Sequence, residues 1–243
     1  MEKELYKEMF ELEKGYWWHI GRKKLVSELI KRHFGNHRIS ILDFGCGTGA
    51  TMQSLESHGE VIGVDTSREA INFCTARGMT NAIKISAQSG LKRSIKRKFD
   101  LITALDVIEH IKDDQKTLME LGSLLKEKGS IIITVPAYPF LWSYWDEYAH
   151  HKRRYTARSL RKLLEKSGFK VVKLSYFYSF ILPAVMLMRI AKSKSRPGRN
   201  SDFVKFPKAI NSLMIRISGI ERQLLKSFRI PFGLSVVCLA EKV

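Results

Sequence analysis

The chain has 243 residues, 44% of them hydrophobic and 27% charged, which suffices for one domain with a full core and a small appendage. Its first residues lack a signal-peptide pattern, and the spacing of Cys46, Cys74 and Cys238 excludes a disulfide framework and a zinc site, so we expect a protein of the reducing cytosol. Of the net charge of +18, almost all lies in residues 151–243, which contain 21 Lys and Arg against 4 Asp and Glu. This basic excess indicates that the last third binds a substrate or a surface.

The chain begins with two helical patterns separated by a cluster of aromatic residues. Apolar side chains recur at helical spacing over residues 5–13 and again over residues 22–34. Between them, residues 16–19 read Tyr-Trp-Trp-His. Such aromatic side chains either close over a bound ligand or pack the helix against the core, and both roles are consistent with the sequence.

The most informative stretch is a glycine-rich loop between two apolar runs. The first run, residues 39–42, leads into three alternating glycines, and the second ends in Asp65, twenty positions after the first glycine, Gly45. Glycines let the backbone turn sharply and approach a ligand, and the free N–H groups of the next helix bind a carboxylate or phosphate. A carboxylate at the end of the next strand can hold both hydroxyls of a ribose. The pattern therefore predicts a site for a ligand that carries a ribose.

Three motifs, in the same order, resemble those of class I S-adenosylmethionine-dependent methyltransferases. Residues 43–49 read Asp-Phe-Gly-Cys-Gly-Thr-Gly, like the first motif, and residues 99–110 and 125–136 resemble the segments around the fourth and fifth strands. The resemblance implies S-adenosylmethionine as the cofactor, with Asp65 on the ribose hydroxyls and Asp43 and the glycines around the methionine moiety. The cofactor-binding residues expected on this basis are Asp43, Gly45, Cys46, Gly47, Gly49, Asp65, Thr66, Ser86, Ala87 and Leu105.

The adenine end of the expected site departs from the family pattern. Residues 82–85 predict a third strand that leads into Ser86, Ala87 and Gln88. Related enzymes commonly have an aspartate here for the exocyclic amine of the adenine. This chain has Ser86 or Gln88 instead, and either side chain could accept the hydrogen bond, although a neutral acceptor binds more weakly than a charged one.

Acidic and histidine side chains follow the fourth strand. Asp106, Glu109 and His110 have i, i+3, i+4 spacing, which predicts one face at the start of a helix beside the cofactor. With His151 or its neighbour His150, they resemble the divalent-metal site of ubiquinone-pathway O-methyltransferases and small-RNA 2′-O-methyltransferases, although an aspartate replaces the glutamate usual at 106. That resemblance implies magnesium or manganese bound by Asp106, Glu109, His110 and His151. Many methyltransferases have Glu-His here without a metal, and then His110 or His151 must act as the base.

The segment after the fifth strand is expected to form the wall of the acceptor site, because such loops stand at the carboxyl edge of the sheet. Residues 151–156 read His-Lys-Arg-Arg-Tyr-Thr, and residues 231–235 read Pro-Phe-Gly-Leu-Ser. Both resemble a bacterial and archaeal group of type 11/23 methyltransferases often found alongside polysaccharide and lipid-glycan enzymes. The resemblance supports an acceptor that is lipid-linked or otherwise membrane-borne.

The last third also contains an insertion between two predicted strands. Residues 171–178 alternate as a sixth strand and residues 230–240 as the last one, and the stretch between them is far longer than a hairpin needs. An apolar run interrupted by Pro183 and a second amphipathic helix are both fringed by Lys and Arg. The run is too short for a confident membrane span. The pattern predicts either a helical pair that lies on an anionic membrane or a helical cap on the catalytic domain.

Together these patterns predict an α/β protein with a doubly wound, Rossmann-like, seven-stranded sheet, a C-terminal antiparallel strand and a basic, apolar helical insertion before that strand. We expect N-terminal helices over residues 1–34, the cofactor-binding core over 35–178, the insertion over 179–229 and the last strand over 230–243. The expected function is methylation of an oxygen on a small or lipid-linked acceptor, by a cytoplasmic enzyme that can associate peripherally with a membrane. One alternative is a 2′-O RNA methyltransferase, favoured by the basic last third. The other is a non-catalytic membrane- or nucleic-acid-binding protein, disfavoured by the intact glycine motif.

Overall fold

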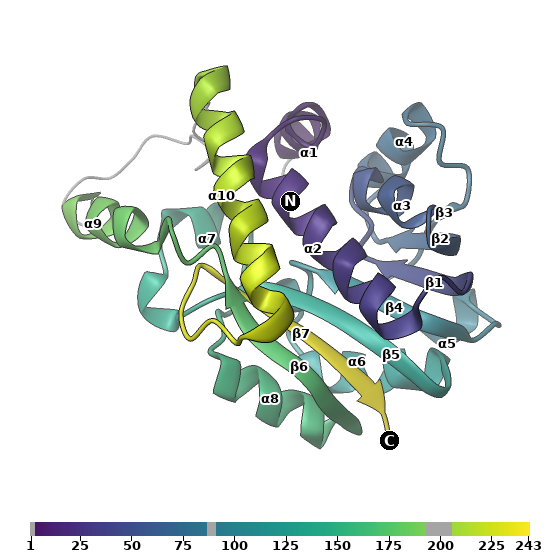
Figure 1. Ribbon diagram of the computed structural model, residues 1–243. Helices are drawn as coiled ribbons and strands as arrows, with labels where there is room; N and C mark the ends of the chain where they lie inside the picture. Colours follow the sequence, from purple (N-terminus) through teal and green to yellow (C-terminus); the bar gives the residue numbers. More distant parts are fainter. Residues whose placement is uncertain (1–2, 87–90, 193–205) are drawn as a thin grey trace.

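The computed structural model describes residues 3–86, 91–192 and 206–243, and a seven-stranded sheet forms its centre. The strand order is β3-β2-β1-β4-β5-β7-β6, and neighbouring strands are parallel except that β7 runs antiparallel to both β5 and β6 (Figure 1). The strands are β1 (Ile39–Phe44), β2 (Gly59–Asp65), β3 (Ala82–Lys84), β4 (Phe99–Leu105), β5 (Leu125–Pro136), β6 (Phe169–Phe177) and β7 (Ser235–Lys242). The predicted Rossmann-like sheet with an antiparallel last strand is confirmed.

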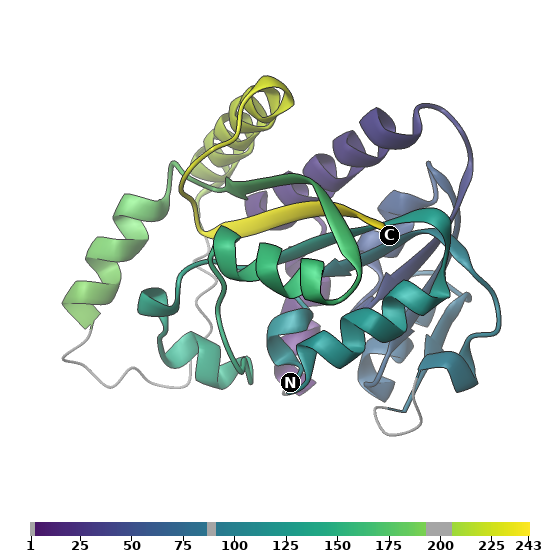
Figure 2. The same cartoon turned by 90° about the horizontal axis from the view of Figure 1, so that it is seen from below.

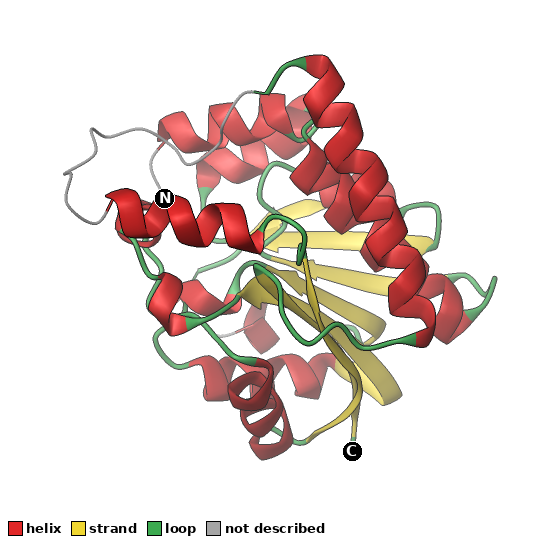
Figure 3. Ribbon diagram, turned by 60° about the vertical axis from the view of Figure 1, so that its left-hand side comes forward, coloured by secondary structure: helices red, strands yellow, loops and turns green. Residues whose placement is uncertain are grey.

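Helices cover both faces of the sheet because alternate side chains of the central strands enter two different apolar clusters. Ile41 of β1 packs with residues of the helical layer that contains α2 and α10, whereas its neighbour Leu42 packs with residues of α6 and α8. The sheet lies between these layers in the view from below (Figure 2), and helices flank it again in the rotated view (Figure 3). The helices are α1 (Lys3–Leu12), α2 (Trp17–Phe34), α3 (Ala50–Leu55), α4 (Arg68–Ala76), α5 (Leu91–Ser94), α6 (Asp114–Leu124), α7 (Tyr144–Tyr148), α8 (Ala157–Lys166), α9 (Leu182–Lys192) and α10 (Lys208–Ser227).

The parallel strands bring the loops after β1, β2, β4 and β5 to one edge of the sheet. Asp43 of β1 pairs in register with Gly63 of β2 and with Thr103 of β4. Just beyond, Gly45 has a φ of 73°, and a Cβ built on it would lie 2.4 Å from Cγ2 of Val107. Only glycine therefore fits where the chain leaves β1 against the segment that follows β4.

The segment after β4 differs from the expected helix start. Asp106 has a φ of 57°, and Ile108–His110 form a 3₁₀ turn, η1. The following helix, α6, begins only after Asp113, whose side chain caps it by accepting a backbone N–H of the first turn. The expectation of one helical face was wrong here, and a tight turn presents Glu109 and His110 instead.

The insertion between β6 and β7 forms helices α9 and α10. The latter packs along α2, and its Glu221 carboxylate accepts the backbone N–H groups of Tyr178 at 3.0 Å and Ser179 at 2.8 Å. Lys226 also forms an ion pair with Glu28 of α2, with a distance of 3.1 Å between Nζ and Oε1. One face of α10 therefore belongs to the helical layer on the sheet, whereas α9 projects beyond the edge of the sheet (Figure 1).

The last strand begins later than expected, at Ser235 rather than at residue 230. Before it, the chain approaches β6 irregularly, and the carbonyl of Ile230 accepts the N–H of Tyr176 at 3.1 Å. Pro231 has no N–H to donate to a neighbouring strand, which explains the delay. In the part of the chain that the structure describes, no helix combines the length and apolar character needed to cross a bilayer.

Candidate active site

Asp65 stands at the carboxyl end of β2 with both carboxylate oxygens held by backbone groups. Its Oδ2 accepts the N–H of Gly47 at 3.0 Å, and its Oδ1 accepts the N–H of Ser67 at 2.8 Å. Burial raises the pKa of the carboxyl, and these backbone donors oppose the shift. The carboxylate is thus fixed directly beside the glycine-rich loop.

Asp43 precedes the same loop and is 2% exposed. Its Oδ1 accepts the hydroxyl of Thr103 at 2.6 Å, and its Oδ2 has no hydrogen-bond partner among the described residues. Burial raises the pKa of Asp43 to about 6. A buried carboxyl with an unused acceptor atom is the kind of group that a ligand's donor can satisfy.

The other residues expected around the cofactor differ in their surroundings. Cys46 is buried within the loop as a free thiol, and Leu105 is buried at the end of β4. Thr66 and Ser86 are exposed where β2 and β3 lead into their loops. Ala87 and Gln88, the second residue considered for the adenine contact, lie outside the described residues.

A buried network, which the sequence did not reveal, connects the N-terminal segment to the glycine-rich loop. The Glu13 carboxylate accepts the hydroxyl of Thr48 and, at 3.0 Å, the Nη2 of Arg77. Burial raises the pKa of Glu13, and the neighbouring donor and cations oppose that shift. Nearby, α1 packs on α4 with the rings of Phe10 and Phe73 5.0 Å apart. The N-terminal segment therefore helps to hold the glycine-rich loop in place.

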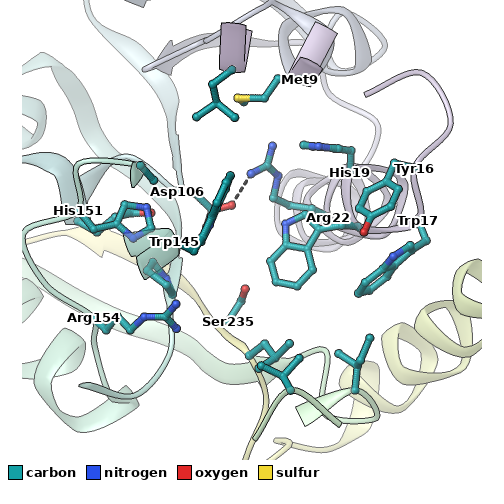
Figure 4. A pocket seen from close by; sticks show the side chains of 18 of the residues that line it. Met9, Tyr16, Trp17, His19, Arg22, Asp106, Trp145, His151, Arg154 and Ser235 are labelled. Atoms are coloured by element: carbon teal, nitrogen blue, oxygen red, sulfur yellow. Dashed lines mark hydrogen bonds and ion pairs between the residues drawn. The ribbon is translucent and has the colours of Figure 1, made fainter. Parts of the chain in front are cut away.

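A cavity of about 290 Å³ lies beside this edge of the sheet and is lined in part by side chains of α1, α2, α7 and α9 (Figure 4). The residues that form its aromatic and aliphatic walls are Leu5, Met9, Tyr16, Trp17, Trp18, Trp145, Ile181, Val185, Met188, Phe206 and Leu234. Trp17, in the aromatic cluster near the N-terminus, packs on Tyr178 with ring centroids 5.1 Å apart, as the packing role predicts. It also lines the cavity, and closure over a ligand stays a prediction. The cavity suits a ligand with an apolar body.

One side of the cavity carries Glu109, His110 and His151, whose oxygen and nitrogen atoms lie within 4.8 Å of one another. Glu109 is fully buried, and neither of its carboxylate oxygens has a hydrogen-bond partner among the described residues. Burial raises the pKa of Glu109 well above its usual range and lowers the pKa of His110 to about 4. A buried, unpartnered carboxyl beside two imidazoles can bind a proton, a hydroxyl or a metal ion.

Asp146 of α7, whose role the sequence did not reveal, holds His151 in this group. Its Oδ1 lies 2.8 Å from Nδ1 of His151 and 2.7 Å from Nε of Arg154. Burial alone would raise the pKa of Asp146, but the hydrogen bonds from His151 and Arg154 outweigh it and lower the pKa to about 2. A possible signal in the sequence was the Ser-x-x-Asp pattern that begins at Ser143 and forms the capping box of α7.

Of the four side chains expected to bind a metal, the structure brings three together. Asp106 is engaged elsewhere, because it forms an ion pair with Arg22 of α2 and accepts the hydroxyl of Thr134 at 3.0 Å (Figure 4). The histidine after β5 that reaches the group is His151, whereas His150 is exposed and has a φ of 60°. Arg22, which the sequence analysis did not single out, is half-buried and lines the cavity.

Comparison with known proteins identifies related sequences. The sequence model of one family, described as a methyltransferase domain, matches residues 17–174. The chain is 29% identical over 117 residues to the ubiquinone biosynthesis O-methyltransferase of Rickettsia canadensis, covering 46% of this chain and 50% of that protein. It is 28% identical over 98 residues to the protein of the same name from Coxiella burnetii, covering 39% and 42%. The matches thus span about half the length of these relatives or less.

Solved structures have the same fold at low identity. A SAM-dependent methyltransferase from Archaeoglobus fulgidus matches with a TM-score of 0.55 and 23% identity, over 90% of this chain and 94% of that one. The plantazolicin methyltransferase BpumL, in complex with SAH, matches with a TM-score of 0.60 and 15% identity, over 98% and 89%. At these identities the likeness shows the fold alone. These relatives and structures do not support the alternative of a 2′-O RNA methyltransferase.

Proposed function

The chain belongs to the family of methyltransferase domains whose sequence model covers residues 17–174, and from that premise we propose that it methylates an oxygen of an acceptor with an apolar body. It is a class I, S-adenosylmethionine-dependent methyltransferase, as the glycine motif predicted. The observation that carries the proposal is the cavity, whose apolar walls meet the buried Glu109 beside His110 and His151. Within the described part of the chain, neither carboxylate oxygen of Glu109 has a hydrogen-bond partner. A hydroxyl fits this group because it can donate to a carboxylate or an imidazole and also accept a hydrogen bond.

We place the cofactor at the carboxyl edge of β1 and β2. When bound, S-adenosylmethionine supplies an already activated methyl group, so the chain chiefly has to position the two substrates. We assign the ribose hydroxyls to Asp65, because backbone N–H groups fix its carboxylate beside the loop. We assign the amino group of the methionine moiety to Asp43, because its Oδ2 is buried and has no partner among the described residues.

For the chemical step we assign the proton of the acceptor's hydroxyl to His151. Its Nδ1 is engaged by Asp146, and its Nε2 lies 4.0 Å from Oε1 of Glu109, on the side of the cavity. His110, whose pKa is lowered to about 4, is uncharged at neutral pH, so it adds no positive charge beside the imidazole that receives the proton. Removing the proton makes the oxygen a better nucleophile. The oxygen then forms its bond to the methyl carbon while the bond between that carbon and the cofactor's sulfur breaks, and the electron pair of the broken bond stays on the sulfur.

The same group of side chains fits a magnesium or manganese ion. Glu109 offers two buried oxygens without a partner among the described residues, and His110 and His151 add two nitrogens within reach. When bound, such an ion would lower the pKa of the acceptor's hydroxyl and orient it. Asp106 is held by Arg22, so the ion would have three protein ligands rather than four. With the ion bound, Nε2 of His151 would be one of these ligands and would not take the acceptor's proton.

We further propose that the acceptor is lipid-linked and is reached at an anionic membrane surface. Support comes from α10, which leaves an apolar stripe exposed: Ile210, Leu213, Ile220 and Leu224 are 40–63% exposed. The insertion, residues 179–229, contains 11 Lys and Arg against 2 Asp and Glu, which complements anionic headgroups. Phe206, four residues before the stripe begins, lines the cavity.

The product that the purified chain forms tests these assignments. Labelled S-adenosylmethionine is mixed separately with chloroform-soluble, water-soluble and RNA fractions of cells, with chelator alone or with magnesium or manganese restored. We expect the label in a chloroform-soluble product that has gained one CH₂, which tandem mass spectrometry places on oxygen. A methyl group on nitrogen or carbon, or label in RNA alone, would contradict the proposal. An equal rate in chelator would remove the ion and leave the histidine as base.

A further inference from the structure

We propose that Asp146 is a positioning residue that holds His151 in the tautomer with a proton on Nδ1 and a free lone pair on Nε2. The inference rests on the proposed O-methylation, because it gives the nitrogen that receives the acceptor's proton a defined state. Asp146 itself is not assigned a contact with the acceptor, and it acts through His151.

The contacts of Asp146 require its carboxylate to accept a hydrogen bond from the imidazole of His151. The carboxylate is fully buried, and its Oδ1 receives the Nε–H of Arg154 at 2.7 Å while its Oδ2 accepts the backbone N–H of Ser143 at 2.9 Å. These donors, one of them a guanidinium, keep the carboxylate ionised. An ionised carboxylate can only accept hydrogen bonds, so the Nδ1 of His151 at 2.8 Å must be the donor.

This tautomer determines whether the other ring nitrogen of His151, Nε2, carries a proton. In a neutral imidazole with a proton on Nδ1, Nε2 carries a lone pair and no proton. That atom lies 4.0 Å from Oε1 of Glu109, and the His151 ring stands edge-to-face against the ring of His110 with centroids 4.7 Å apart. The lone pair therefore belongs to the polar group of the cavity, where it can take a proton or bind a metal ion.

The backbone builds this arrangement from one segment. The left-handed turn at His150, with a φ of 60°, lets the chain return so that the N–H of His151 donates to the carbonyl of Asp146 at 2.8 Å. Arg154 in turn donates from Nη1 to the carbonyl of Ala137 at 3.1 Å, which ties the segment to the end of β5. Asp146 and His151 are thus joined by a backbone hydrogen bond as well as by the contact of their side chains, which fixes the imidazole as a positioning role requires.

Substitution of Asp146 by Leu tests the inference, with ring-nitrogen NMR as the main measurement. The chain has seven histidines, and the signals of His151 are assigned by their loss in His151→Gln. In the wild-type protein we expect the proton on Nδ1. Leu offers no acceptor to Nδ1, so in Asp146→Leu we expect a substantial population with the proton on Nε2 and an initial rate of methyl transfer into chloroform-soluble lipid that falls about 10- to 100-fold.

The matched control is Glu147→Leu, a change to the same residue at the exposed neighbouring position of α7, which should leave both the tautomer and the rate unchanged. A proton on Nε2 in the wild-type protein would overturn the inference, even if the variant fails to fold. An unchanged rate in a folded Asp146→Leu variant would also overturn it. The tautomer is measured without an acceptor, so a correct tautomer with no O-methyl product would refute the proposed function and leave the placement of the proton intact.

Discussion

The two sides of the active site are built in different ways. On the cofactor side, Asp43, the glycine-rich loop and Asp65 come from one stretch of 23 residues, and backbone N–H groups hold the second carboxylate. On the acceptor side, side chains from Trp17, His151 and Phe206 meet around one cavity although they are far apart in the sequence. The cofactor side is therefore a local motif, whereas the acceptor side depends on the whole fold. Changes on one side should therefore leave the other intact.

The largest expected effect separates the two sides completely. His151→Gln removes the nitrogen that we assign to the acceptor's proton, and a general base typically contributes about 100- to 10,000-fold to the rate. We expect methyl transfer to the lipid fraction to fall by a factor in this range, with cofactor affinity unchanged in a calorimetric titration. His150→Asn, at the exposed neighbour, is the control and should keep full activity, because Asn favours the left-handed backbone that this position requires. Full activity in His151→Gln would remove this histidine from the chemistry.

The next effect belongs to the cofactor side. Asp65→Ala removes a carboxylate that we expect to accept both ribose hydroxyls, and losing two charge-assisted hydrogen bonds costs about 2–4 kcal/mol, or roughly 30- to 1,000-fold in affinity. Calorimetric titration with S-adenosylmethionine measures the change. Because Asp65 also holds the backbone of the loop, circular dichroism should confirm that the variant is folded, and Glu56→Ala provides an exposed acidic control. Unchanged affinity in the folded variant would place the ribose elsewhere.

This contrast also explains how much the sequence could predict. The sheet and its antiparallel last strand were predictable because apolar runs, the glycine motif and the spacing to Asp65 are local patterns. The position of His151 could be anticipated only as one of two neighbouring histidines, since the left-handed turn at His150 decides which of them faces the cavity. Local spacing was misleading at Asp106, where a left-handed residue and a 3₁₀ turn replace the expected helix start.

Other parts of the site could not be predicted because they depend on partners distant in sequence. Glu13 reads as one more charge on a helix, yet it is buried against Thr48 and Arg77. Arg22 likewise finds Asp106 only once α2 is packed on the sheet, 84 positions away in the chain. Ion pairs of this kind leave no periodic signal in the sequence, because each partner alone resembles a surface residue.

A smaller effect is expected from pH on the cofactor side. Burial raises the pKa of Asp43 to about 6, so acid neutralises the carboxylate that we assign to the methionine amino group. Cofactor affinity should therefore fall by at most about tenfold for each pH unit below 6. The effect on the free protein has the opposite sign: a carboxyl with a raised pKa in the folded state contributes stability at low pH that is lost as pH rises through about 6.

Titrations at pH 5 and pH 7.5 with the wild-type protein and with Asp43→Asn measure this dependence. Asp65 is present in both proteins, so the difference between their pH profiles isolates Asp43. We expect weak binding by the variant at both pH values, with the acid dependence reduced. The same decline in both proteins below pH 6 would assign the dependence to another group.

The smallest expected effect lies at the outer rim of the acceptor side, on α10. Leu213 and Ile220 are 54% and 63% exposed, so Leu213→Ser with Ile220→Ser should leave the fold intact and weaken binding to anionic vesicles. Arg216→Gln on the same helix should weaken it about fivefold, because one basic residue near such a surface is worth roughly 1 kcal/mol. Met119→Ser, at an equally exposed apolar residue of α6, is the control and should change nothing. Flotation with anionic and neutral vesicles measures the bound fraction. Absence of binding to anionic vesicles would refute the membrane proposal and leave α10 as a helical cap alone, while the product assay would still decide the chemistry.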